Sequence, residues 1–402
     1  MTASSELGGL ARRAGDVQLI GGVSAAHFVS HYYILVLPPL FAFIRADYGV
    51  SYTELGLALT VFNAVSALLQ TPAGFLIDRF NARLILVAGL LIGAAGLVIA
   101  AAVHSYWVLV VMFGLMGLGN TVYHPADYAL LSRHVSPERM SQAYSLHTFA
   151  GLLGSAAAPA GMLFAHALFG WRGAFISAAA LGLLAAGMLL LQGDAPARGA
   201  ARPHEGAALD GSWRLLLSPP ILINFLFFTL LAFGNYGLMN FAVVALGATH
   251  GTPVAAANAA LSGNLFMAAF GVLLGGVIAA RTARHGLTVS LGLLAAGLCT
   301  LLVGLVDLST WPLVLAMSLT GLCFGLVMPS RDMIVRAVTP PGAFGKVFGF
   351  VTNGFNIGGI LSPLLFGALM DRGEPALVFW VIAASTAACV VTLALMPRRR
   401  AG

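Results

Sequence analysis

The sequence predicts an all-α polytopic membrane protein with twelve transmembrane helices in two pseudo-symmetric six-helix bundles. Three observations predict this class. The 402 residues are 59% hydrophobic and only 8% charged, whereas soluble domains are about 45 to 50% apolar and about 25% charged. The apolar residues form about twelve long runs, and the two halves of the chain resemble each other.

Each apolar run is long enough for one membrane crossing. A transmembrane helix needs about 20 mostly apolar residues, whereas the strands of membrane barrels alternate over about 10 residues. The runs therefore predict helices near residues 17–44, 53–77, 84–103, 107–131, 142–167, 174–192, 218–247, 257–280, 287–306, 312–335, 346–370 and 376–396.

The basic residues predict the orientation of these helices. Positive charge is retained in short cytoplasmic loops, and with the N-terminus inside, the outer loops hold only Arg45, Arg172 and Arg372. Both termini are therefore predicted to be cytoplasmic. The net charge of +6 follows from this bias, and we expect a lipid bilayer and no nucleic acid as partner.

An internal repeat relates the two halves. A shift of 204 residues places GLGNTVYHPADY over GLCFGLVMPSRD without a gap, so that Pro125 meets Pro329 and Asp127 meets Arg331. Parallel repeats of this kind build many transporters. We expect a first bundle over residues 1–192, a cytoplasmic linker over 193–216 and a second bundle over 217–402.

One loop carries a motif that resembles a known family. In GFLIDRFNAR, Gly74 is followed by Asp78, Arg79 and Arg83 at the spacing of the loop signature of the major facilitator superfamily. Within that superfamily, AHFVSHYY and GLGNTVYHPADY resemble the fosmidomycin resistance group and its uncharacterised relatives. The loop residues are predicted to form a gating element, in which Gly74 lets helices approach closely.

The resemblance implies the major facilitator fold and secondary active transport. We expect a protein of the bacterial inner membrane that functions as a monomer, uses no cofactor or metal and moves a small molecule by alternating access. Export of a drug-like or anionic compound, driven by protons, is preferred. Proton symport that takes up an organic acid or another small nutrient is the alternative.

Histidines are the candidate proton-coupling groups. A rise of about 1.5 Å per residue places His27 and His124 at similar depths, roughly 13 to 15 Å into the membrane. His31 follows His27 by one helical turn, and His147 lies in the next helix. Because imidazole titrates near pH 6.5, such residues can exchange protons across a physiological gradient. The alternative is that each only forms hydrogen bonds between helices.

Asp127 is a further coupling candidate, and Arg331 is a candidate for cargo binding. These equivalent positions of the repeat carry opposite charges, so they are predicted either to pair across the substrate cavity or to use local partners. For Asp127 the local partners are Arg79 or Arg83, and for Arg331 they are Asp332 or an anionic cargo.

Other polar residues within the apolar runs are candidates to line the substrate cavity: Asn120, Tyr123, Asn235, Tyr236, Asn240, Asn264, Asn353 and Asn356. No enzyme is expected, because the sequence lacks H-E-x-x-H, G-x-S-x-G and the nucleotide-binding G-x-x-x-x-G-K-[ST].

Overall fold

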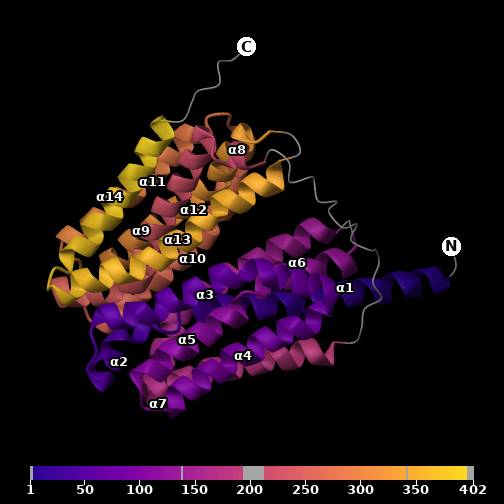
Figure 1. The fold of residues 1–402 in the computed structure, drawn as a ribbon, viewed down its shortest axis with the longest axis horizontal. Coiled ribbons are helices and arrows are strands. Elements are labelled where there is room, and N and C mark those ends of the chain that lie inside the picture. Colours follow the sequence, from indigo (N-terminus) through magenta and orange to yellow (C-terminus); the bar gives the residue numbers. More distant parts are fainter. Residues whose placement is uncertain (1–2, 137–138, 193–211, 341–342, 396–402) are drawn as a thin grey trace. The chain divides into compact units, whose positions relative to one another are not determined.

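The computed structural model describes residues 3–136, 139–192, 212–340 and 343–395, and the regular elements within these ranges are all helical (Figure 1). In the first half of the sequence these are α1 (Ala3–Ile34), the 3₁₀ turn η1 (Pro38–Leu40), α2 (Phe41–Tyr48), α3 (Tyr52–Arg79), α4 (Ala82–Ala102), α5 (Tyr106–Asn120), α6 (Tyr123–His134) and α7 (Met140–Leu191). The second half contains α8 (Ser212–Leu216), α9 (Pro219–His250), α10 (Val254–Arg281), α11 (His285–Leu305), α12 (Thr310–Val338), α13 (Phe344–Asp371) and α14 (Ala376–Ala394).

Eleven stretches of the described chain are long and apolar enough to cross a membrane. One of them covers 50 residues of α7, which would extend about 75 Å as one helix and cannot fit a hydrocarbon core of about 30 Å. Gly170 interrupts this helix with φ 71° and ψ 175°. The chain reverses there, so α7 supplies two crossings and the predicted twelve are present.

Prolines divide two of the predicted helices into shorter pieces. The first run ends its regular helix at Ile34, and Pro38 and Pro39 then form the 3₁₀ turn before α2. The fourth run breaks between α5 and α6, because Pro125 has no N–H to donate to the carbonyl of Thr121. The equivalent Pro329 lies inside the continuous α12.

By their contacts, the residues form two compact units. The first comprises Met1–Val36 with Ala64–Glu205, and the second comprises Leu37–Asn63 with Gly206–Gly402. Residues 37–63, which the sequence places in the first bundle, thus group with the second unit. Hydrogen bonds to α13 account for this grouping, since Thr60 donates to the Ile360 carbonyl and Asn63 to the Gly359 carbonyl.

In the first unit, α7 packs against α1 and α4, and α6 contacts the same two helices. Small residues permit the closest approach: a Cβ at Gly154 of α7 would collide with the backbone of Phe28 in α1. This contact fixes the lateral position of α1 against α7, the two helices that carry three of the candidate histidines.

In the second unit, α10 packs against α12, α9 against α13 and α14, and α11 against α12 and α14. A Cβ at Gly321 or Gly325 of α12 would collide with backbone carbonyls of α10. Close packing through small residues is the usual way in which membrane helices associate.

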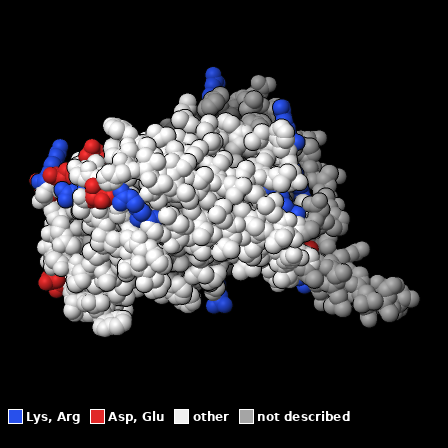
Figure 2. Space-filling model, turned by 90° about the horizontal axis from the view of Figure 1, so that it is seen from below, with Lys and Arg blue, Asp and Glu red and all other residues white. Residues whose placement is uncertain are grey.

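The surface of the described chain is strongly apolar. Figure 2 shows a face on which Lys, Arg, Asp and Glu side chains are sparse. Large apolar side chains such as Leu91, Val98, Phe164 and Leu298 are exposed, as expected for helices whose outer faces contact lipid. The protein is therefore an integral membrane protein.

The predicted linker lies mostly outside the described residues, which omit 193–211. Its last five positions form α8 (Ser212–Leu216). One turn of helix therefore precedes α9, and the cytoplasmic linker over 193–216 remains a prediction.

Candidate functional site

Five titratable side chains from three helices of the first unit meet in one cluster. His27 and His31 lie one turn apart on α1, His124 and Asp127 lie within the first five residues of α6, and His147 belongs to α7. The break before Pro125 places His124 and Asp127 at the start of α6. We call this set the histidine cluster.

Asp127 lies at the buried end of the histidine cluster. Its side chain is 0% exposed, its Oδ2 atom lies 3.0 Å from Nε2 of His147, and the same atom lies 3.2 Å from Nδ1 of His27. The rings of His27 and His147 stack at 3.8 Å between centroids. A buried carboxylate is thus held between two imidazoles, which is an arrangement able to hold and relay a proton.

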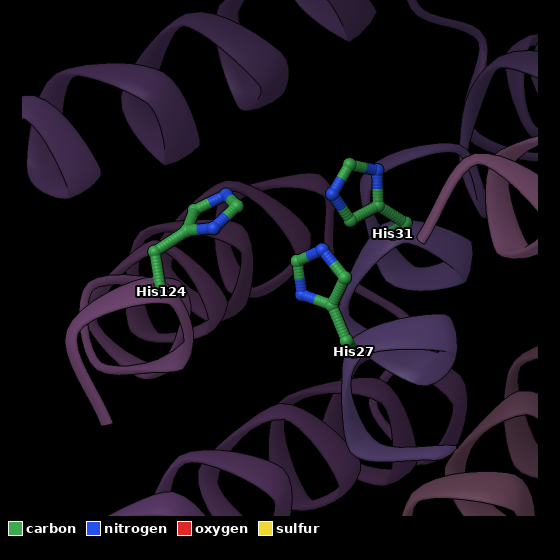
Figure 3. A group of neighbouring side chains, drawn as sticks. All are labelled: His27, His31 and His124. Carbon is green, nitrogen blue, oxygen red and sulfur yellow. The ribbon is translucent and has the colours of Figure 1, made fainter. Parts of the chain in front are cut away.

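His31 and His124 lie at the more accessible end. His31 is half-buried and its Nδ1 lies 3.2 Å from the Ser155 hydroxyl oxygen, whereas His124 is exposed. The His124 ring centroid lies 4.9 Å from that of His27 and 6.1 Å from that of His31. Figure 3 shows the three imidazoles turned toward a common point.

Glycine on α7 makes room for these rings. A Cβ at Gly151 would lie 2.6 Å from atoms of the His27 ring and 3.0 Å from Cδ2 of His31. His147, Gly151 and Ser155 follow one another at intervals of four residues, and thus form one stripe of α7. The stripe shows that Ser155 is part of the site, although the sequence analysis passed over it.

Aromatic rings border the histidine cluster on α6 and α7. Tyr128 lies 5.4 Å from His147 and 5.3 Å from Tyr144, measured between ring centroids. Tyr128 is exposed. Tyr123, by contrast, is buried, with its ring beside Gly89 of α4 and its hydroxyl near Gly93. Tyr123, a predicted cavity residue, is therefore packed inside the first unit.

Arg331 finds a local partner in the second unit. Its guanidinium bonds the carboxylate of Asp332, with Nε 2.9 Å and one terminal nitrogen 2.8 Å from Oδ1. The guanidinium also lies over the ring of Phe228, 4.5 Å from the centroid, and 5.3 Å from that of Phe355. Asp127 and Arg331 each have partners within their own unit. For Arg331, this agrees with the alternative in which it pairs with its neighbour Asp332. Asp127 uses histidines rather than Arg79 or Arg83.

The predicted polar residues of the cavity have varied surroundings. Asn120 donates to Ser66, Asn264 to the Met317 carbonyl, Asn235 to the sulfur of Met239 and Asn356 to the side-chain oxygen of Asn353. Asn240 is buried in α9, and Tyr236 lies near Gly359. The bonds of Asn120 and Asn264 to other helices fit helix packing. Asn353 is exposed.

The loop motif is only partly described. The side chain of Asp78 lies outside the described residues, and Arg79 is exposed. Arg83 is buried and donates to the Gln192 carbonyl at 2.6 Å. A Cβ at Gly74 would meet no atom of the described chain within 4 Å. The role of Gly74 in a close helix approach therefore remains a prediction.

A carboxylate at the end of α13 caps the start of α3. The oxygens of Asp371 accept hydrogen bonds from the backbone N–H groups of Tyr52 and Thr53, at 2.7 and 2.8 Å, and from the Thr53 hydroxyl at 2.6 Å. The first N–H groups of a helix have no partner within the helix, and a negative charge there is favourable. This contact joins residues 318 and 319 positions apart, and the sequence analysis did not predict it.

The fold defines a polytopic helical membrane protein with a buried polar cluster in its first unit. The family model of the Major Facilitator Superfamily matches residues 23–241 and again residues 225–402. The chain therefore belongs to the Major Facilitator Superfamily, as its loop motif and repeat predicted.

Curated relatives have several different names. The chain is 29% identical over 149 residues to a probable L-galactonate transporter and 23% identical over 141 residues to the fosmidomycin resistance protein, both from Escherichia coli (strain K12). These matches cover 37% and 35% of this chain, and 33% and 34% of the relatives. The chain thus spans about a third of the length of each relative.

Solved structures agree over almost the whole chain. A mutant of the nucleoside transporter NupG superposes with a TM-score of 0.80 at 16% identity, covering 94% of this chain and all of that one. A bacterial homolog of the human lysosomal transporter Spinster, in an inward-facing and occupied conformation, gives a TM-score of 0.73 at 19% identity, covering 94% of both chains. These likenesses show the fold.

Proposed function

We propose that this transporter is a proton-coupled secondary active transporter that exports a drug-like or anionic small molecule across the bacterial inner membrane by alternating access. It acts as a monomer with both termini in the cytoplasm. The observation that carries the proposal is the buried Asp127 between His27 and His147. Ionisable groups inside membrane helices are expensive and mark ion or substrate pathways.

The cluster contains the elements that a proton relay needs. Asp127 and His147 are buried, His27 stacks on His147, and His124 is exposed. A proton taken up at His124 can thus pass through His27 to the buried carboxylate in short steps. His31 is the fifth member of the cluster, and the titratable groups beside the cluster are Tyr123, Tyr128 and Tyr144.

The preference for export rests on the fosmidomycin resistance protein and the multidrug resistance proteins among the relatives. A second candidate function is uptake of an organic acid by proton symport. It is supported by the name of the probable L-galactonate transporter. Both functions need the same proton site and differ in the direction of cargo relative to the proton.

Reconstituted liposomes that enclose a pH-sensitive dye test both functions. Fosmidomycin, phosphonates, organic acids, sugars and cationic drugs are added outside in turn. Antiport alkalinises the lumen when cargo enters and symport acidifies it, whichever way the protein is inserted. We expect alkalinisation with at least one compound. A cargo that enters without any change in lumen pH would contradict proton coupling.

Two variants localise the coupling. His124→Ala removes the exposed imidazole of the cluster, whereas His134→Ala removes an imidazole of the same helix whose Nδ1 lies against the Leu130 carbonyl. We expect the first variant to lose cargo-dependent proton movement and the second to retain it. Equal loss in both variants would show that the histidine cluster has no special part in coupling.

A further inference from the structure

We propose that His27, His31 and His124 form a binding site for a divalent first-row transition-metal ion such as Zn²⁺. The site concerns the same cluster as the proposed function, but it does not require transport, because it can be tested by equilibrium binding to the purified protein. The potential donor atoms of the three imidazoles all lie within 4.8 Å of one another. Figure 3 shows their rings facing a common point.

The first argument is the orientation of His27. Its Nδ1 lies 3.2 Å from the carboxylate oxygen Oδ2 of Asp127. This contact is an ion-pair distance without hydrogen-bond geometry, but a carboxylate so close to Nδ1 favours the tautomer with its hydrogen on Nδ1, which leaves the lone pair of Nε2 for a metal. Metal-binding histidines almost always have this arrangement, in which a carboxylate or another polar group holds the ring nitrogen that does not bind the metal.

His31 has an equivalent partner. Its Nδ1 lies 3.2 Å from the hydroxyl oxygen of Ser155, which can accept a hydrogen from Nδ1 and so leave Nε2 to bind the ion. His27 and His31 lie one turn apart on the same face of α1, with ring centroids 4.6 Å apart. The two Nε2 atoms thus lie on one helix face, and Asp127 and Ser155 orient the two rings through their Nδ1 atoms. These two imidazoles supply two of the three ligands of the proposed site.

His124 completes the set from a second helix. It is exposed and no hydrogen-bond partner holds its ring in the described part of the chain, so a χ rotation can bring one of its nitrogens to the ion. Zinc binds imidazole nitrogen at about 2.0 to 2.1 Å in tetrahedral geometry, which places the donors about 3.4 Å apart. Ring rotations therefore suffice to close the site.

The donor chemistry selects the class of ion. Three neutral imidazoles suit Zn²⁺, Cu²⁺, Ni²⁺ or Co²⁺, whereas Mg²⁺ and Ca²⁺ prefer oxygen ligands. Three protein ligands leave one position of a tetrahedron open. Water or an anionic group of the cargo can occupy this position, which would link the site to the proposed anionic cargo.

A second group, formed by His27, Asp127 and His147, also brings three potential donors together. All three side chains are buried, and the hydrogen bond from His147 to Asp127 at 3.0 Å already accounts for its geometry. The accessible set with His31 and His124 is therefore the better site, and Asp127 supports it from behind.

Zinc titration of the purified full-length protein tests the proposal. The protein carries an affinity tag without histidine, and binding is measured by calorimetry at pH 7.5 on the unmutated protein and on His31→Ala, His124→Ala and His134→Ala. We expect one Zn²⁺ per chain and at least about tenfold weaker binding in the first two variants, since loss of even an outer partner costs about 10- to 100-fold. His134→Ala should bind as the unmutated protein does.

X-ray absorption of the zinc-loaded unmutated protein supplies a readout that does not depend on any variant. The site predicts nitrogen scatterers from three imidazoles. An ion with only oxygen neighbours, no binding at all, or equal binding by the unmutated protein and the two cluster variants would overturn the proposal. None of these results bears on proton movement in liposomes, so the proposed function stands or fails separately.

Discussion

The Nε2 atom of His147 lies 3.0 Å from Oδ2 of Asp127, and both side chains are at most 1% exposed. Taking an ionisable pair out of water is costly unless both partners are well bonded. A second imidazole, that of His27, shares the same carboxylate oxygen at 3.2 Å. The carboxylate is therefore the group on which the buried part of the histidine cluster converges.

Replacing this carboxylate by an amide should uncouple transport. Asp127→Asn keeps the size of the side chain but removes its ability to exchange a proton, so we expect cargo-dependent proton movement to fall to the background of empty liposomes. Asp307→Asn, in the exposed loop before α12, is the matched control and should transport normally. Proton movement by Asp127→Asn at the rate of the unmutated protein would remove this residue from the mechanism.

A methyl group at Gly151 should displace the imidazoles. Its Cβ would lie 2.6 Å from the His27 ring, and overpacking of this kind costs about 1 to 3 kcal/mol. We expect Gly151→Ala to lower both the transport rate and the midpoint of thermal unfolding. Gly187→Ala, on the same helix with no atom within 4 Å of the added Cβ, should change neither.

The pH dependence of zinc binding follows from imidazole chemistry. Only a neutral imidazole binds a metal, and a free imidazole takes up a proton near pH 6.5. Protons compete with the ion for the same ring nitrogens of His27, His31 and His124, so apparent affinity should not rise as the pH decreases from about 8 and should fall wherever the pH is low enough to protonate these rings. His147, Asp127 and the nearby Tyr128 and Tyr144 also face the cluster. Affinity that increases as the pH decreases would argue against imidazole ligands.

Arg331 should not be replaceable by lysine. Its guanidinium bonds Asp332 through two nitrogens and stacks over Phe228, and an ammonium group offers neither the fork nor the flat surface. We expect Arg331→Lys to weaken apparent cargo affinity several-fold in the transport assay. Arg336→Lys, exposed on the same helix, serves as the control. Unchanged concentration dependence in Arg331→Lys would exclude this residue from cargo binding.

Removing the Asp371 carboxylate should destabilise the start of α3. Asp371→Ala leaves two backbone N–H groups and the Thr53 hydroxyl without their acceptor. Loss of a helix cap typically costs about 1 kcal/mol, so the thermal midpoint in detergent should drop by a few degrees at most. Asp307→Ala is the control for loss of an exposed carboxylate. An equal midpoint for both variants would show that the cap contributes nothing.

Hydropathy alone predicts the twelve crossings, because lipid requires long apolar segments whose backbone bonds are satisfied internally. It also predicts the interruption of α7 at Gly170, which lies between the predicted helices 142–167 and 174–192, but it does not predict the breaks at Pro38 and before Pro125, where local bonding decides the backbone. The division of the chain into bundles at 192 and 217 remains a prediction.

Only part of the site can be predicted from the sequence. Spacing on one helix predicts that His27 and His31 share a face, and depth places His124 at a similar level. Contacts between helices depend on packing, for which the local sequence carries no signal. The sequence therefore does not predict that Ser155 lies behind His31, that Gly151 lies beneath the rings or that Asp371 caps the start of α3. The roles of the predicted coupling and cavity residues remain proposals.

The central claim is that a proton gradient drives the cargo through the histidine cluster. The most direct measurement is accumulation of a cargo identified in the liposome screen, with and without an imposed pH gradient, in the unmutated protein and in Asp127→Asn. The account predicts accumulation against the cargo gradient only in the unmutated protein, only with the pH gradient, and abolished by a protonophore. Accumulation that is the same without the gradient, or that persists in Asp127→Asn, would contradict it.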